Sequence, residues 1–153
     1  MQMVTNWHGE LIDMAKIAGA YVLAIPVGWY REREAHSIGV RTFPLVAMAS
    51  CAFVLVAVPL GQADLAAQSR VIQGLVAGIG FIGGGAILKS DAGSVHGTAT
   101  AASIWNTGAV GAAVAQDRFL LAVLLTALNL FALRVLLPWK LKLDARKSAG
   151  DTD

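Results

Sequence analysis

The chain has 153 residues, a length typical of a single domain. Hydrophobic residues make up 56% of the chain and charged residues 14%, whereas soluble domains contain roughly 25% charged residues. With so few charges, a surface exposed to water would be prone to aggregation, so the composition favours a surface that faces lipid. The net charge of +2 is too small to favour nucleic acid as a partner, and the single cysteine, Cys51, excludes an intrachain disulfide framework.

Five segments have the composition of membrane-spanning helices, which need about 20 mostly apolar residues. They cover residues 11–30, 42–60, 71–88, 98–116 and 119–139. The first carries Asp13 and Lys16 in its first turns, and no basic residue precedes them, so we expect an uncleaved helix and not a signal peptide. The fourth is uncharged but weakly hydrophobic, and the fifth is interrupted only by Arg134. We therefore predict an all-α fold, a polytopic membrane helix bundle of about five transmembrane helices over residues 1–139.

Lysine and arginine in the connections predict the orientation, because they are enriched on the cytoplasmic side. Arg31, Arg33 and Arg41 lie between the first two segments, Lys89 lies between the third and fourth, and residues 140–153 form a basic tail. We expect the N-terminus outside and this tail in the cytoplasm, in a bacterial inner membrane.

The charged run that follows the first segment reads "RERE", residues 31–34. We interpret it as part of a solvated loop that fixes the topology. The alternative is that Glu32 and Glu34 contact a divalent cation, but two carboxylates without further oxygen ligands make a poor dedicated site. The histidines lack the spacing of zinc ligands, so we name no metal, and we expect no cofactor.

The third segment contains "GIGFIGGG", residues 78–85, which matches the glycine pattern of dinucleotide-binding loops. That pattern also needs an acidic residue about 20 positions later, and none is found there. A phosphate loop needs a glycine directly before its lysine, whereas Leu88 precedes Lys89. Both nucleotide interpretations therefore lack their second half.

Glycines four residues apart favour close helix packing in lipid, because neighbouring backbones approach where side chains are absent. The pairs Gly74/Gly78 and Gly80/Gly84 have this spacing, and small residues continue it into the fourth segment. We predict helix packing at these positions. The alternative is a helix broken at residues 83–85, which would line a cavity.

Polar residues inside spans are candidate functional positions. Gln73 and Asn106 could bind a ligand, or could form interhelical hydrogen bonds of about 0.6–2 kcal/mol. Asn129 is interpreted as a helix–helix contact. Arg70 could pair with Asp64 or Asp117, or could anchor at the interface.

The motifs together resemble those of the MgtC/SapB family of bacterial membrane proteins. "RVIQGLVAGIGFIGGGAILK" from Arg70 onward, followed by "VHGTATAASIW" and "GAVG", carries most of the resemblance. Upstream, "GWYRERE" and "IGVRTFPLVA" are similar to two further family elements, although Tyr30 stands where the family usually has a glutamate. Thr98 and Ala99 also replace the usual leucine and threonine.

The resemblance implies an inner-membrane protein associated with adaptation to low magnesium and, in pathogens, with survival inside host cells. Some members are thought to act on other membrane complexes, including the proton-translocating ATP synthase. Longer members carry a C-terminal cytoplasmic domain, whose function is not transferred here.

We expect an accessory or regulatory factor and not an enzyme, working in the lipid bilayer through contacts with itself as a homo-oligomer or with a partner complex. The alternatives are a small ion or solute transporter with a site at the glycine-rich third helix, and an oligomeric membrane anchor. The candidate functional or helix-packing positions are Arg41, Arg70, Gln73, Gly78, Gly80, Gly83, Gly85, Thr100, Trp105 and Asn106.

Overall fold

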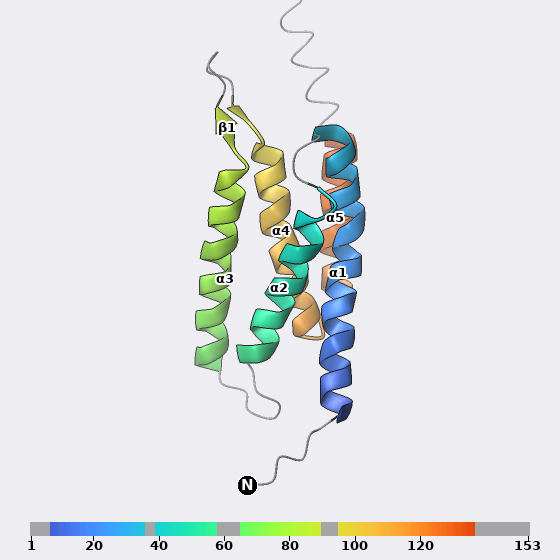
Figure 1. Ribbon diagram of the computed structural model, residues 1–153, viewed down its shortest axis with the longest axis vertical. Helices are drawn as coiled ribbons and strands as arrows, with labels where there is room; N and C mark the ends of the chain where they lie inside the picture. The colour runs from blue at the N-terminus through green and yellow to red at the C-terminus, as the bar shows by residue number, and fades with distance from the viewer. Residues whose placement is uncertain (1–6, 36–38, 58–64, 90–94, 137–153) are drawn as a thin grey trace, which may run out of the picture.

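The computed structural model describes residues 7–35, 39–57, 65–89 and 95–136, and within these ranges the chain is almost entirely helical. The five α-helices of these ranges run up and down a single bundle (Figure 1). They are α1 (Trp7–Ala35), α2 (Thr42–Ala57), α3 (Leu65–Gly85), α4 (Thr98–Ala115) and α5 (Phe119–Phe131), which continues into a π-helical turn, η1 (Ala132–Leu136). The predicted all-α helix bundle is confirmed, and its orientation in a membrane stays a prediction.

Helix α4 lies at the centre of the bundle and contacts α1, α2, α3 and α5 (Figure 1). Many of its buried residues are small or polar, among them Thr100, Ser103, Gly108 and Gly111. A helix surrounded by other helices gains more from close approach than from bulky apolar side chains. This position explains why the fourth segment is only weakly hydrophobic.

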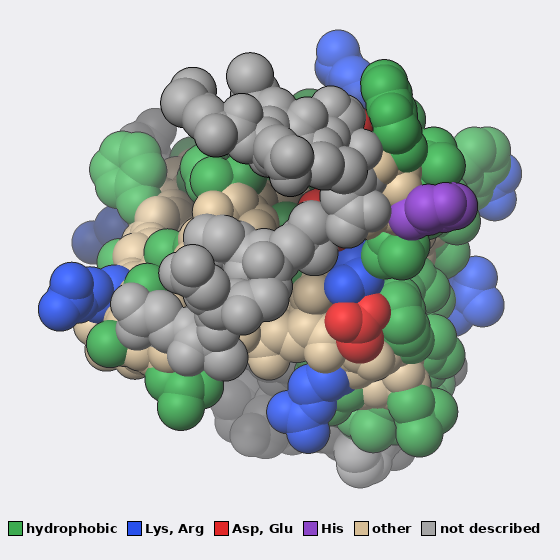
Figure 2. Space-filling model, turned by 90° about the horizontal axis from the view of Figure 1, so that it is seen from below, with side chains coloured by type: hydrophobic (Ala, Val, Ile, Leu, Met, Phe, Trp, Pro, Cys, Tyr) green, Lys and Arg blue, Asp and Glu red, His purple; other side chains and the backbone are tan. Residues whose placement is uncertain are grey.

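The outer helices supply the hydrophobic surface. In the described part of the chain, three stretches are long and apolar enough to cross a membrane: Trp7–Glu34, Leu65–Gly85 and Phe119–Leu136. Val56, Phe81 and Leu120 are each more than four-fifths exposed. Figure 2, which looks onto the end where α1 begins, shows hydrophobic side chains around the rim with charged groups scattered between them. Such a surface is unfavourable in water and suits lipid.

Helices α2 and α4 approach so closely that side chains are excluded at the contact. A Cβ atom added to Gly111 would overlap the carbonyl oxygen of Ala47 and come within 2.9 Å of the Ser50 Cβ. One turn earlier, a Cβ on Gly108 would overlap the Cδ1 atom of Ile79 from α3. The small residues of α4 therefore set the distance between backbones at the core.

Helix α1 is longer than the predicted first segment and continues to Ala35. The charged run 31–34 therefore lies on a helix, and its interpretation as part of a loop is wrong; Arg31 is buried, whereas Glu32, Arg33 and Glu34 are exposed as expected. Ala20, Ala24 and Val27 are buried along one side, and Arg31 follows them at helical spacing. The arginine continues the buried face because α4 offers it a polar partner.

Helix α3 begins at Leu65, earlier than predicted, and is continuous up to Gly85. The glycine triplet forms its last turn, where the Ala86 N–H donates to the Gly83 carbonyl at 3.0 Å. A short antiparallel hairpin follows, with β1 (Leu88–Lys89) paired to β2 (Val95–His96). The triplet thus ends the helix at one end of the bundle.

The turn into α4 requires glycine. Gly97 has a φ of 87°, in the left-handed region that L side chains rarely adopt. A Cβ at this residue would also overlap the carbonyl oxygen of Ala86. Gly97 thereby places the start of α4 directly beside the end of α3.

Candidate functional site

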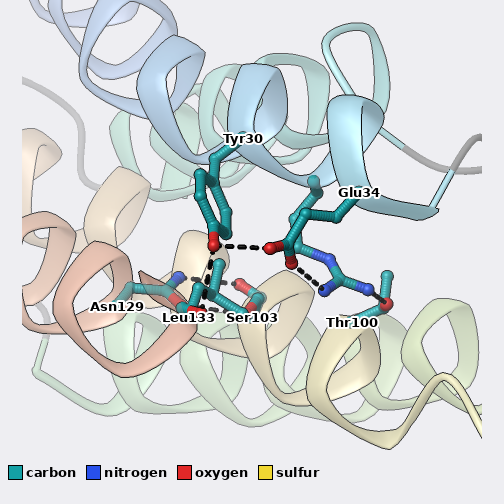
Figure 3. A network of polar contacts seen from close by, with 7 residues as sticks. Tyr30, Glu34, Thr100, Ser103, Asn129 and Leu133 are labelled. Atoms are coloured by element: carbon teal, nitrogen blue, oxygen red, sulfur yellow. Dashed lines mark hydrogen bonds and ion pairs between the residues drawn. The ribbon is translucent and has the colours of Figure 1, made fainter. Parts of the chain in front are cut away.

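The strongest candidate site is a group of polar contacts that links the last turns of α1 to α4 and α5 (Figure 3). Arg31 is at its centre and is only 6% exposed. One of its terminal nitrogens donates to the hydroxyl of Thr100 in the first turn of α4, and the other lies 3.9 Å from a carboxylate oxygen of Glu34. A buried guanidinium at this point is costly unless charge and hydrogen bonds compensate it.

Tyr30 connects the same cluster to α5. Its hydroxyl donates to the carboxylate of Glu34 at 2.6 Å, and the carbonyl oxygen of Leu133 lies 3.3 Å away (Figure 3). The guanidinium carbon of Arg134 lies over the Tyr30 ring, 5.5 Å from its centroid. Tyr30, at the position where the family resemblance predicts glutamate, thus contacts a carboxylate one turn further along α1.

Neutral hydrogen bonds hold α4 against α5 further into the bundle. The Ser103 hydroxyl donates to the amide oxygen of Asn129 at 2.9 Å (Figure 3). Asn106 donates from its amide nitrogen to the carbonyl oxygen of Leu125 at 3.2 Å. These contacts are interhelical hydrogen bonds, which were predicted for Asn129 and were one of the two alternatives for Asn106.

The predicted candidate positions fall into two groups. Thr100 and Asn106 take part in the polar contacts, and Gly83 is buried, with the carbonyl oxygen of Ala101 only 3.3 Å from where its Cβ would lie. The remaining positions lie on exposed surface: Arg41, Arg70, Gln73, Gly78, Gly80, Gly85 and Trp105. The structure therefore does not bring the predicted positions together at one site.

Sequence reasoning missed Arg31, the most deeply buried charged residue of the cluster. The signal that points to it is the spacing of Ala20, Ala24 and Val27, which reaches residue 31 when the helix is extended by one turn. The alternating charges of residues 31–34 favoured a solvated segment instead, because such runs are typical of exposed parts of a chain. Its partner Thr100 is distant in sequence and becomes apparent only in the fold.

A second ionic contact lies toward the opposite end of the bundle. Lys16, whose side chain is 11% exposed, donates to the Asp117 carboxylate at 2.8 Å and to the Ala115 carbonyl at 3.3 Å. It therefore joins α1 to the end of α4. Asp117, one of the two predicted partners of Arg70, pairs with Lys16 instead, and the other, Asp64, lies outside the described residues.

An apolar groove of about 810 Å³ separates α2 from α3. Its walls include exposed Leu45 and Phe53 on α2, and Gly74, Gly78 and Ile82 on α3. The groove offers apolar contact and no charged lining group. Within the described residues, no group of three or more His, Cys, Asp or Glu side chains is placed to hold a metal ion.

Comparison with known proteins gives a consistent result. The sequence profile of the MgtC family matches residues 17–140. The protein SrpB of Synechococcus elongatus is 38% identical over 145 residues, which cover 87% of this chain and 80% of SrpB. MgtC of Brucella abortus is 36% identical over 105 residues, which cover 69% of this chain and 43% of that protein.

A third relative is YhiD of Escherichia coli, a protein named as a candidate magnesium transporter. It is 33% identical over 116 residues, which cover 71% of this chain and 53% of YhiD. The match therefore spans about half the length of the MgtC and YhiD relatives, and most of SrpB. No solved structure matches the chain.

Proposed function

The chain belongs to the MgtC family, and from this premise we propose that it is a multi-pass protein of the inner membrane that regulates or assists a partner through helix contacts. The setting we propose is adaptation to magnesium limitation or related stress. The proposed role is binding and regulation, without catalysis.

The observation that carries this proposal is the open space beside most glycines of α3, which lie on two sides of the helix: Gly74 and Gly78 toward the groove against α2, and Gly80 and Gly84 on the opposite flank. A Cβ atom added to Gly74, Gly78, Gly80, Gly84 or Gly85 would meet no atom within 4 Å. Only 6% of the apolar stretch of α3 is buried inside the bundle, against 22% for α1 and 17% for α5. Glycine costs about 1 kcal/mol relative to alanine in a helix, so an exposed series of glycines is best accounted for by a partner that approaches closely.

Gln73, which lies on the same side of α3 as Gly80 and Gly84, supports the same proposal. Gln73 is exposed, and its amide nitrogen donates to the Ser69 hydroxyl of its own helix at a long 3.4 Å. Ala77, Gly80 and Gly84 follow it at the i+4, i+7 and i+11 positions, and all are exposed. A partner helix on this seam would gain backbone contact and could satisfy the amide, which is unfavourable in lipid.

Two kinds of partner fit the proposal. One is a second copy of this chain, and the other is a larger membrane complex, of which ATP synthase is the example implied by the family resemblance. A photoreactive residue placed at Ala77, with the full chain expressed in its native membrane, distinguishes them by mass spectrometry of the cross-linked product.

The matched control for cross-linking is a photoreactive residue at Leu120, which is 85% exposed on α5. We expect a discrete product from position 77 and only lipid adducts from position 120. Gly80→Leu should abolish the product, whereas Ala127→Leu on the exposed side of α5 should leave it intact. Equal products from both positions would contradict the proposal.

Transport of a small ion or solute is the second candidate function. Its support is the name of the relative YhiD together with the polar residues on the central helix. Magnesium or proton flux in proteoliposomes of the purified chain tests it. Flux that is lost in Asn106→Ala would replace the regulatory proposal with transport.

A further inference from the structure

Two helices, α2 and α4, begin toward the same end of the bundle (Figure 1). Two consecutive residues of α1, Arg31 and Glu32, contact their starting segments. The start of a helix carries a partial positive charge and favours an anionic neighbour. Glu32 meets this preference at α2, because its carboxylate accepts the Val40 N–H at 2.6 Å, two residues before the helix begins.

At α4 the neighbour has the opposite sign. The N-cap residue is Gly97, which has no side chain to bond the N–H groups of the first turn, and these groups have no acceptor within the helix. The side chain that approaches is the guanidinium of Arg31, which donates to Thr100. A full positive charge thus lies beside a helix start equivalent to about half a positive charge.

The nearby carboxylate only partly compensates this charge. Glu34 lies 3.9 Å from the guanidinium, beyond hydrogen-bonding distance, and its closest hydrogen bond, at 2.6 Å, is with Tyr30. The Nε atom of Arg31 is buried and has no hydrogen-bond partner among the described residues. Buried charged groups are normally paired and hydrogen-bonded, so among the described residues the guanidinium lacks an anion within hydrogen-bonding distance.

We propose that Arg31 and the first turn of α4 form a binding site for a phosphate group. The guanidinium would offer Nε–H, the helix its free N–H groups, and Thr100 the hydrogen of a hydroxyl whose oxygen already accepts from Arg31. A tetrahedral oxyanion has enough acceptor oxygens for all three kinds of donor, and arginine with a helix start is a recurring combination for phosphate.

The phosphate has two possible sources, a phospholipid headgroup of the adjoining leaflet or a soluble phosphate. This end of the bundle is the one with Arg41 and Lys89, which would attract either. The phosphate site shares no residue with the exposed glycines of α3, so the phosphate-binding proposal and the proposed function can fail independently of each other.

Binding of radiolabelled inorganic phosphate to the full chain, purified in phospholipid-free detergent, tests the soluble source by equilibrium dialysis. Native mass spectrometry with added phosphatidylglycerol tests the headgroup, with diacylglycerol, which has no phosphate group, as the comparison lipid. We expect specific retention of at least one probe, weakened about tenfold or more in Arg31→Gln and less in Arg31→Lys, because loss of a charge-assisted contact has this magnitude.

The matched control is Arg33→Gln, which removes an arginine that stacks on Trp29 from the same turn of α1. It should leave binding within about twofold, since rim charges contribute little. Retention that falls equally in both variants, retention of both lipids to the same extent, or no binding of either probe would overturn the proposal.

Arg31→Gln could also lose binding by unfolding, so Glu34→Gln provides a test that leaves every α4 contact of Arg31 in place. Removing the competing carboxylate should strengthen phosphate binding by about threefold to tenfold. If Arg31 has a purely structural role, Glu34→Gln should not increase phosphate binding. Unchanged phosphate binding in Glu34→Gln would therefore also contradict the proposed phosphate site.

Discussion

Helices α3 and α4 are successive helices of the chain and both contain several small residues, yet apart from Gly83, which faces α4, their glycines lie in opposite environments. On α4, Gly108 and Gly111 are buried where another backbone or side chain occupies the space of a Cβ. On α3, Gly78 and Gly80 border open space. The same spacing of small residues therefore marks a contact completed within the chain in one helix and a contact left open in the other.

The difference shows what small residues in a membrane helix do and do not specify. They permit close approach, but the partner is determined by the position of the helix in the bundle. A central helix such as α4 has its partners in the same chain. An outer helix such as α3 has only one side covered, and its remaining glycines are available to another molecule or to lipid.

The largest effect is expected from Gly111→Ala. The added methyl group overlaps the backbone oxygen of Ala47, which cannot rotate away, so α2 and α4 must separate. We expect a loss of about 3 kcal/mol in the free energy of unfolding, measured by denaturant titration in detergent with tryptophan fluorescence. Gly78→Ala is the matched control, and equal stability of the two variants would remove the distinction between α3 and α4.

Gly97→Ala should follow, with a loss of about 2 kcal/mol from the left-handed backbone and from overlap with the Ala86 carbonyl. Because Gly97 connects β2 to α4, the loss of stability should appear as faster hydrogen exchange in the β1–β2 hairpin and in the first turn of α4. Gly85→Ala, with open space and no left-handed backbone, should leave exchange there unchanged.

Gly108→Ala is expected to cost less, about 1 kcal/mol, because the atom that it meets is the terminal methyl of Ile79. A flexible side chain can change rotamer where a backbone oxygen cannot. Measured in the background of Ile79→Val, which removes that methyl, Gly108→Ala should cost less, because the nearest remaining atoms are the Cγ1 of residue 79 at 3.2 Å and the Ser50 Oγ at 3.4 Å. A cost that persists undiminished in the double variant would show that α3 and α4 are held apart by something other than this contact.

The smallest effect is expected from Gly80→Ala on the open face. The purified chain should be unchanged or more stable by up to about 1 kcal/mol, because alanine favours the helix and meets no atom. Cross-linking from Ala77 in native membranes should nevertheless weaken, since a partner loses its close approach. A stability loss in the purified chain would show that the face is covered within the bundle.

Much of the fold follows from the sequence. The fourth and fifth helices begin at Thr98 and Phe119, where apolar segments are predicted to begin, and the all-α bundle follows from the composition. The length of α1 could not be predicted, because its last turn carries the charged residues 31–34. Arg31 is buried against Thr100, a contact 69 positions away that no local pattern encodes.

The candidate site was predictable only in part. Thr100 was selected through the family motif, and the interhelical bond of Asn106 through its polarity within an apolar segment. The glycine spacing predicts packing but cannot tell inward from outward faces, because both helices present the same pattern. That distinction depends on which helix the chain places at the centre.

The central position of α4 has a consequence for how the protein is made. A helix whose inward residues are mostly glycine, alanine, serine and threonine gains little from lipid when it leaves the insertion machinery alone. In a membrane, we expect its stable integration to depend on the helices that precede it and on the leucine-rich α5 that follows. We therefore expect insertion of the bundle to be cooperative, with the central helix integrated last.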